Sequence, residues 1–167
     1  EPAGQPDTPG RATVLDEGRA QALRKVAEGD PRNPGARTEL GNMYFDAERY
    51  GEAIPWYTEA LKLDPKNVNV STDLGVSYYY AGQTDRAITQ FEYSLSVDPK
   101  HLKTLLNLGV VRAFGQRDLQ GAADAWKQVV ALAPDSPEGQ TARRSLDAIQ
   151  SAHGETKGDT QGQTPSR

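Results

Sequence analysis

The chain has 167 residues, a formal net charge of −4 and an apolar fraction of 36%, which is low for a single compact globule. The negative charge argues against nucleic acid as a partner, because no basic field would attract a polyanion. The absence of cysteine excludes disulfides, thiol catalysis and cysteine-ligated metal sites. No stretch approaches the roughly 18 apolar residues that a membrane-spanning helix needs, so we expect no insertion of this segment into a membrane.

Both ends of the chain are expected to be disordered. Residues 1–11 and 153–167 are rich in Gly, Pro, Thr and Gln and hold almost no large apolar side chain. Such segments bury too little surface to offset the entropy of ordering. The first residue is Glu1 rather than Met, and we interpret the first tail as a linker that follows a signal peptide, an anchor or another domain. The compartment stays open between a bacterial periplasm and a cytoplasm.

An amphipathic helix is predicted over residues 12–30. Its apolar stripe is formed by Leu15, Ala22, Leu23 and Val26. The stripe precedes an Asp-Pro pair, which ends a helix because proline disfavours helical geometry in the residue before it. The segment therefore has the pattern of a second helix of a repeat without its first.

A repeat of 34 residues governs the rest of the chain. Prolines 31, 65 and 99 are spaced 34 residues apart, and Pro134 follows after 35. The same apolar and glycine pattern lies upstream of each later proline: Leu40, Gly41, Tyr44, Ala53, Tyr57 and Ala60; Leu74, Gly75, Tyr78, Ala87, Phe91 and Ser94; Leu108, Gly109, Ala122, Trp126 and Val129. The third copy carries one extra residue in its central turn.

This pattern resembles the tetratricopeptide repeat, whose signature is Leu-Gly-x-x-Tyr, Ala-x-x-x-Phe and a closing Pro. The resemblance implies an all-α, right-handed α-solenoid over residues 12–152. Its helix pairs fall at about 34–67, 68–101 and 102–136, and a capping helix follows at 137–151. The signature Trp is replaced by Arg37, Ser71 and Leu105.

The repeated glycines lie inside predicted helices, where Gly costs about 1 kcal/mol relative to Ala. Close approach of two helices would compensate for that cost. The resemblance assigns the aromatic residues of the signature to the core, namely Tyr44, Tyr57, Tyr78, Phe91 and Trp126.

The resemblance also implies that the first helix of each repeat lines a concave groove. The remaining first-helix stripe would face it: Thr38, Asn42, Phe45 and Asp46; Thr72, Val76, Tyr79 and Tyr80; Lys103, Leu106, Val110 and Phe114. Phe45 and Tyr79 are favoured for exposure over Tyr80 and Phe114, which lie close to a turn. The alternative is that these aromatic side chains pack against neighbouring helices.

One specific ligand class is rejected. Some chaperone adaptors of this family clamp a C-terminal carboxylate with five polar groove residues, whose matching positions here are Thr38, Asn42, Asp73, Lys103 and Asn107. Asn42 and Lys103 fit that clamp. Thr38 and Asn107 lack the charge it requires, and Asp73 would repel the ligand.

The pattern predicts a non-catalytic scaffold that binds a protein or peptide. The sequence contains no phosphate-binding glycine loop, no nucleophile elbow and no metal-ligand spacing, so we expect no enzymatic activity, cofactor or metal. Two alternatives remain open. The chain could self-associate as a homo-oligomer, or it could be the interaction domain of a membrane-anchored bacterial envelope-maturation protein.

Overall fold

The computed structural model describes residues 13–158, with side chains as far as Ser151, and these residues contain helices and turns but no strand. The helices are, in chain order, α1 (Glu17–Gly29), α2 (Pro34–Asp46), α3 (Tyr50–Leu63), α4 (Val68–Tyr80), α5 (Thr84–Val97), α6 (Leu102–Val110), a π-helical turn η1 (Val111–Gly115), α7 (Leu119–Leu132) and α8 (Pro137–Gly158).

Two predicted boundaries shift in the structure. Helix α1 begins at Glu17 rather than near residue 12, with Asp16 as its N-cap. Helix α8 continues to Gly158 rather than ending at 151, so residues 153–158 of the predicted C-terminal tail are helical. The predicted tail segments 1–11 and 159–167 lie outside the described residues.

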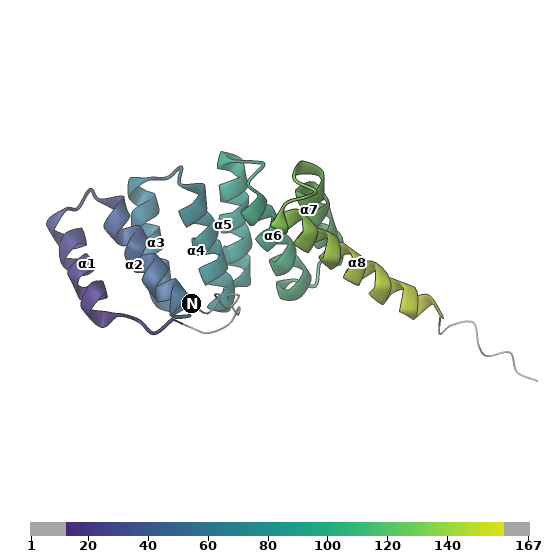
Figure 1. Cartoon of the computed structure of the whole chain (residues 1–167), viewed down its shortest axis with the longest axis horizontal. Helices are drawn as coiled ribbons and strands as arrows, with labels where there is room; N and C mark the ends of the chain where they lie inside the picture. The colour runs from purple at the N-terminus through teal and green to yellow at the C-terminus, as the bar shows by residue number, and fades with distance from the viewer. Residues whose placement is uncertain (1–12, 159–167) are drawn as a thin grey trace, which may run out of the picture. The chain divides into compact units, whose positions relative to one another are not determined.

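The chain divides into two compact units, Glu1–Ala81 and Gly82–Arg167, hereafter unit 1 and unit 2. Unit 1 contains α1 to α4, and unit 2 contains α5 to α8. Within each unit, helices that follow one another in the chain lie side by side (Figure 1). The boundary falls inside the second predicted repeat, between its first and second helices.

The Asp-Pro junctions explain where the helices end and begin. Asp30 and Asp64 end α1 and α3 in non-helical backbone conformations, with φ of −126° and −131°. Asn33 and Asn67 then cap the next helices, because each side-chain oxygen accepts a hydrogen bond from the backbone N–H three residues on, at 3.1 and 3.2 Å. One short motif therefore closes one helix and starts the next.

The extra residue of the third repeat coincides with the π-helical turn η1 at the end of α6. A π-helical turn takes up one more residue than an α-helical turn. Here the N–H of Gln116 donates to the carbonyl of Val111 at 3.2 Å, and the N–H of Asp118 donates to the carbonyl of Arg112 at 2.9 Å. The insertion is thus absorbed before α7 begins.

The repeated glycines allow an aromatic ring to lie directly on a helix backbone. A Cβ atom added to Gly41 would lie 2.5 Å from the ring of Tyr57, and one added to Gly109 would lie closer still to the indole of Trp126. Both rings are almost fully buried, and each polar atom has a partner. The Tyr57 hydroxyl donates to Asn42 Oδ1 at 2.8 Å, and the Trp126 indole N–H donates to the carbonyl of Leu106 at 3.1 Å. At these two glycines the space of the missing side chain is taken by an aromatic ring of the second helix.

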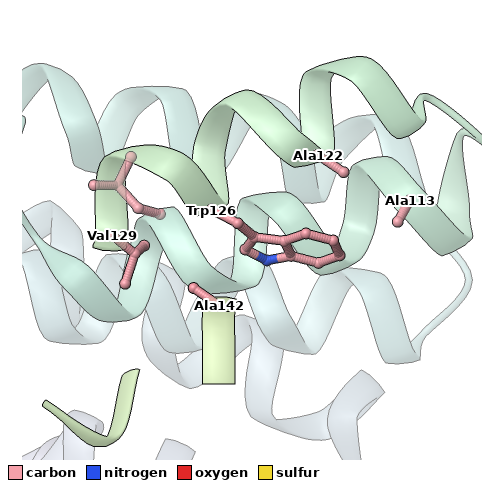
Figure 2. Close-up of a cluster of buried hydrophobic side chains, with 6 residues drawn as sticks. Ala113, Ala122, Trp126, Val129 and Ala142 are labelled. Atoms are coloured by element: carbon pink, nitrogen blue, oxygen red, sulfur yellow. The ribbon is translucent and has the colours of Figure 1, made fainter. Parts of the chain in front are cut away.

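The core of unit 2 surrounds Trp126. Figure 2 shows its indole among small side chains, and the buried cluster consists of Leu105, Ala113, Ala122, Trp126, Val129 and Ala142. Ala142 comes from α8, and Leu146 and Ile149 of the same helix pack against the cluster. Helix α8 therefore covers the apolar surface that the third repeat leaves open, as predicted.

The contact face of α1 differs from the predicted stripe. Ala20 and Ala27 are its buried residues, whereas Ala22 is exposed and Val26 is 47% exposed. Beside these two alanines, Arg24 contacts α2: it donates to the Tyr44 hydroxyl, and its guanidinium lies 5.8 Å from the centre of that ring. A count of apolar periodicity cannot detect a contact made by an arginine.

Arg37 occupies the position of the signature Trp and performs a different task. Its guanidinium donates to the carbonyls of Ala27, Asp30 and Asn33 at 3.0, 3.3 and 2.9 Å. These carbonyls lie at the C-terminal end of α1 and in the junction to α2. Arg37 therefore supplies the positive charge that the last turn of α1 itself lacks.

We expect Gly41→Ala to lower the free energy of unfolding by about 1–3 kcal/mol, because the methyl group would push Tyr57 away from the backbone of α2. Gly51→Ala is the matched control. A Cβ atom there meets nothing within 4 Å, and the substitution should be neutral or stabilising by up to about 1 kcal/mol. Denaturant titration followed by circular dichroism measures both, and equal effects would contradict the close-packing interpretation.

Candidate functional site

Four aromatic side chains of unit 1 form a connected group, hereafter the aromatic cluster: Phe45, Tyr50, Tyr79 and Tyr80. The rings of Phe45 and Tyr50 lie edge to face, with centroids 5.3 Å apart. Tyr50 and Tyr80 are stacked at 4.7 Å with an interplanar angle of 19°, and Tyr79 is 5.4 Å from Tyr80. Stacked and edge-to-face ring pairs of this kind attract one another by about 0.5–1.5 kcal/mol beyond the effect of burying their area.

The turn between α2 and α3 brings the cluster together. The N–H of Arg49 donates to the carbonyl of Tyr44 at 2.8 Å, and the N–H of Glu48 donates to the carbonyl of Phe45 at 2.9 Å. Glu48 adopts a left-handed conformation with φ of 56°, which allows this tight reversal. Tyr50 consequently becomes the first residue of α3 and lies beside Phe45.

The exposure of these aromatic side chains reverses the predicted order. Tyr80 is 61% exposed, whereas Phe45 and Tyr79 are half-buried. In unit 2, Phe114 is 73% exposed. Tyr80 and Phe114 lie at the ends of first helices, where no further helical turn follows to cover them. The two most exposed aromatic side chains are thus those for which the sequence favoured exposure less.

Tyr50 was missed by the sequence prediction. The resemblance assigned the groove to the first helices, and Tyr50 belongs to a second helix. Its place directly after a turn was the available signal, because a residue there can contact the end of a neighbouring first helix. Burial, and repulsion from Glu48 and Tyr80, raise the pKa of Tyr50 above its ordinary value.

The polar groove residues predicted on α2 lie next to this cluster. Asn42 and Asp46 are exposed and Thr38 is half-buried. The ring of Tyr57 links them to the cluster, since its centroid is 6.4 Å from that of Phe45 and its hydroxyl is held by Asn42. Burial raises the pKa of Tyr57, and the charges of Asp73 and Asp46 raise it further.

Two residues predicted to line the groove are not exposed to solvent in this structure. Thr72 is fully buried and Val76 is 8% exposed. The Thr72 hydroxyl donates to the carbonyl of Val68 at 2.8 Å, so its polar group is satisfied within α4. Most residues of α4 are buried, and a helix that is buried around most of its circumference shows no distinct second stripe in its sequence.

The four predicted groove residues of unit 2 have different environments. Lys103 is exposed, whereas Leu106 and Val110 pack against the core around Trp126. Phe114 lines an apolar cavity of about 260 Å³, hereafter the unit 2 cavity. Its lining is formed by η1, α7 and α8 and consists of Ala113, Phe114, Leu119, Trp126, Ser145, Ala148 and Ile149.

The comparisons with known sequences identify the repeat. The family model described as "TPR repeat" matches residues 41–82, and the one described as "Tetratricopeptide repeat" matches residues 72–137. Together the two matches span more than half of the chain. The chain belongs to the tetratricopeptide-repeat family. Members of this family are generally protein-interaction modules rather than enzymes. No curated protein sequence matches the chain.

Solved tetratricopeptide-repeat structures are similar to the chain over most of its length. MamA has a TM-score of 0.66 at 17% identity, covering 87% of this chain and 98% of that one. The first tetratricopeptide-repeat domain of human RPAP3 has a TM-score of 0.67 at 25% identity. This match covers 78% of the present chain and 99% of the RPAP3 chain. The first domain of Spaghetti (RPAP3) has a TM-score of 0.63 at 24% identity, and it was solved bound to the HSP90 peptide SRMEEVD. This match covers 84% of the present chain and 97% of the Spaghetti chain. These likenesses confirm the predicted all-α solenoid fold class.

Two further observations concern the described residues alone. No group of three or more His, Asp or Glu side chains among them is placed to hold a metal ion. None of their helices is both long enough and apolar enough to cross a bilayer.

The raised pKa of Tyr57 predicts a loss of stability at high pH. In the unfolded chain this tyrosine ionises near its ordinary pKa of 10.0, whereas the folded state retains the proton. The stabilising contribution of Tyr57 is therefore fully present below pH 10. As the pH rises above 10, the free energy of unfolding falls by up to about 1.4 kcal/mol per pH unit.

In Tyr57→Phe this alkaline loss should be smaller than in the wild type. At neutral pH the substitution should cost about 1 kcal/mol, because the hydrogen bond to Asn42 is lost. Denaturant titrations across the alkaline range measure both effects. Tyr93→Phe, at an exposed position, is the control. The same alkaline slope in the wild type and Tyr57→Phe would contradict the interpretation.

Proposed function

We propose that the chain is a non-catalytic scaffold and that its aromatic cluster binds a segment of a partner protein. The observation that carries this proposal is the stacked pair Tyr50–Tyr80, in which Tyr80 is 61% exposed although its ring is already oriented by its neighbours. Exposed, pre-oriented tyrosines bind with little loss of side-chain entropy and are enriched among the residues that dominate interface energetics.

Family membership supports this function. Tetratricopeptide repeats generally act as protein-interaction modules, and the similar Spaghetti domain was solved with a bound peptide. In the present chain, the proposed contact residues in unit 1 are the aromatic cluster with Thr38, Asn42 and Asp46 of α2. Because Thr72 and Val76 are buried, we leave them out of the proposed contact surface.

Tyr80→Ala should weaken partner binding by about 2 kcal/mol, or roughly thirtyfold, if Tyr80 is a central contact. Affinity capture from an extract of the source cells, followed by mass spectrometry and titration of each recovered protein, measures this loss. Tyr93→Ala is the matched control, since Tyr93 is 41% exposed but lies on α5 outside the cluster. A partner that binds the wild type and Tyr80→Ala equally would place recognition elsewhere.

Self-association is a second candidate, favoured by the unit 2 cavity. Phe114 and Leu119 at its rim are 73% and 40% exposed, and apolar surface of this kind is often covered by another protein surface. A second copy of the chain would present the same two side chains, and this could form a self-complementary contact.

Sedimentation equilibrium separates the two candidates. If unit 2 associates with another copy, the wild type should form dimers that Phe114→Ser abolishes, because a polar side chain would replace the exposed ring. Leu63→Ser is the control, since Leu63 is 39% exposed but belongs to unit 1. A monomeric wild type at high concentration would exclude self-association as the function of this cavity.

A further inference from the structure

We infer that residues 1–12 cover the aromatic cluster as a ligand within the same chain, with Pro6 and Pro9 packed on its rings, and that a partner must displace them. The inference rests on the proposed function for its binding surface and adds a regulation of that surface. It combines the anchoring of the chain just after this segment, the spacing of the prolines and the exposure of Tyr80.

The first described residue is bound at the end of α2, next to the aromatic cluster. The N–H of Thr13 donates to the carbonyl of Asp46 at 2.9 Å, and the last carbonyls of a helix need such partners from outside it. Asp46 directly follows Phe45 of the cluster. Residues 13–16 then line a cavity of about 140 Å³ together with Met43 and Asp46 of α2. The chain upstream of Thr13 therefore starts from this end of α2.

The rings of the cluster lie within reach of the segment that precedes Thr13. From Phe45 to Tyr80, successive ring centroids are 5.3 and 4.7 Å apart. Pro9 and Pro6 precede Thr13 by four and seven residues. In the polyproline II conformation these separations correspond to about 12 and 22 Å, at roughly 3.1 Å per residue. Both prolines can therefore reach the rings while Thr13 stays bound to α2.

The sequence of residues 1–12 is suited to an aromatic surface. Its prolines, Pro2, Pro6 and Pro9, fix φ near −65° and so favour the polyproline II helix. That helix has three residues per turn, so residues 6 and 9 share one face of it, about 9 Å apart. Proline segments with this spacing bind grooves lined by aromatic rings, and their ordering costs little entropy because the extended form is already favoured.

The stacked tyrosines supply the rings for such a contact. Tyr50 covers one face of the Tyr80 ring at an interplanar angle of 19°, and Tyr80 is nevertheless 61% exposed. Most of this side chain is therefore available to a ligand. A proline ring packed on it would remove apolar surface of both residues from water.

Attachment to the same chain makes a weak contact sufficient. A short flexible tether raises the effective concentration of a ligand at its site to the millimolar range. A segment whose separate affinity is about 1 mM would thus occupy the cluster about half of the time. The docked state alternates with the disordered one that the composition predicts. A partner that uses Tyr80 competes with this occupancy, and its apparent affinity falls by about twofold.

Limited trypsin digestion of the full chain tests the inference at Arg11, between the prolines and Thr13. Docking holds the chain on both sides of this bond, so the cleavage rate measures the undocked fraction. We expect cleavage after Arg11 to be about twofold or more faster in Tyr80→Ala than in the wild type. Tyr93→Ala, at an exposed position outside the cluster, should leave the rate unchanged. Neither substitution alters the sequence around the cleaved bond.

A second variant changes the segment and leaves the helices untouched. Pro6→Ala should also accelerate cleavage after Arg11, whereas Gln5→Ala, the neighbouring control, should not. In nuclear magnetic resonance spectra of the wild type, Overhauser contacts should join Pro6 or Pro9 to the ring of Tyr80, and Pro6→Ala should weaken those that remain. Equal cleavage rates in the wild type, Tyr80→Ala and Pro6→Ala would overturn the inference.

Protein concentration distinguishes the segment of the same chain from that of a second copy. Protection within one chain is independent of concentration, whereas protection by another copy increases with it. Protection that appears only at high concentration would therefore overturn the intramolecular ligand.

The digestion also separates the inference from the proposed function. A partner lost in Tyr80→Ala, together with equal cleavage rates, would refute the covering segment but retain the aromatic cluster as a binding site. Faster cleavage in Tyr80→Ala, together with a partner that binds the wild type and this variant equally, would retain the covering segment and refute the proposed function.

Discussion

The packing of an aromatic ring on a glycine sets the geometry of the first and third repeats. Tyr57 lies against Gly41, and Trp126 lies against Gly109, so in each pair a ring of the second helix rests directly on the backbone of the first. Each ring also makes a hydrogen bond back to the first helix, which fixes the rotation of that helix about its axis. Once the rotation is fixed, the direction of every other side chain on the helix follows from the 3.6-residue period. The presentation of Asn42 and Phe45 at the surface is therefore a consequence of core packing.

The aromatic cluster lies at the turns between helices rather than in the middle of a helix face. A turn supplies residues from the end of one helix and the start of the next, and Phe45 and Tyr50 come together in this way. Tyr80 then extends the group from the end of α4. Insertions or substitutions in the turn would rearrange this surface without touching the glycine–aromatic core. A change of turn sequence would therefore alter which rings this surface presents while the fold is retained.

The fold was largely predictable because its signals are local and recur. Asp-Pro junctions, glycines at a fixed period and the aromatic residues opposite them identify the helix pairs directly from the sequence. The residues assigned to the core, Tyr44, Tyr57, Tyr78, Phe91 and Trp126, are all buried. The surface was less predictable, because exposure depends on tertiary neighbours. Periodicity could not show that Thr72 and Val76 are buried, that Tyr50 joins Tyr80, or that Arg24 contacts Tyr44. The length of α8 was underestimated because its last two turns are polar.

The attachment of α1 has a consequence for local unfolding. This helix buries two alanines, and its C-terminal end is held by the guanidinium of Arg37. Terminal elements of repeat proteins with little buried apolar area open at a lower free energy than the interior. Amide hydrogen exchange in α1 will therefore be faster than in α2 and α3, and detachment of α1 will precede global melting. Each opening exposes Tyr44 and frees Arg49 from Glu17, so the charge distribution of unit 1 changes transiently while the remaining helices stay folded.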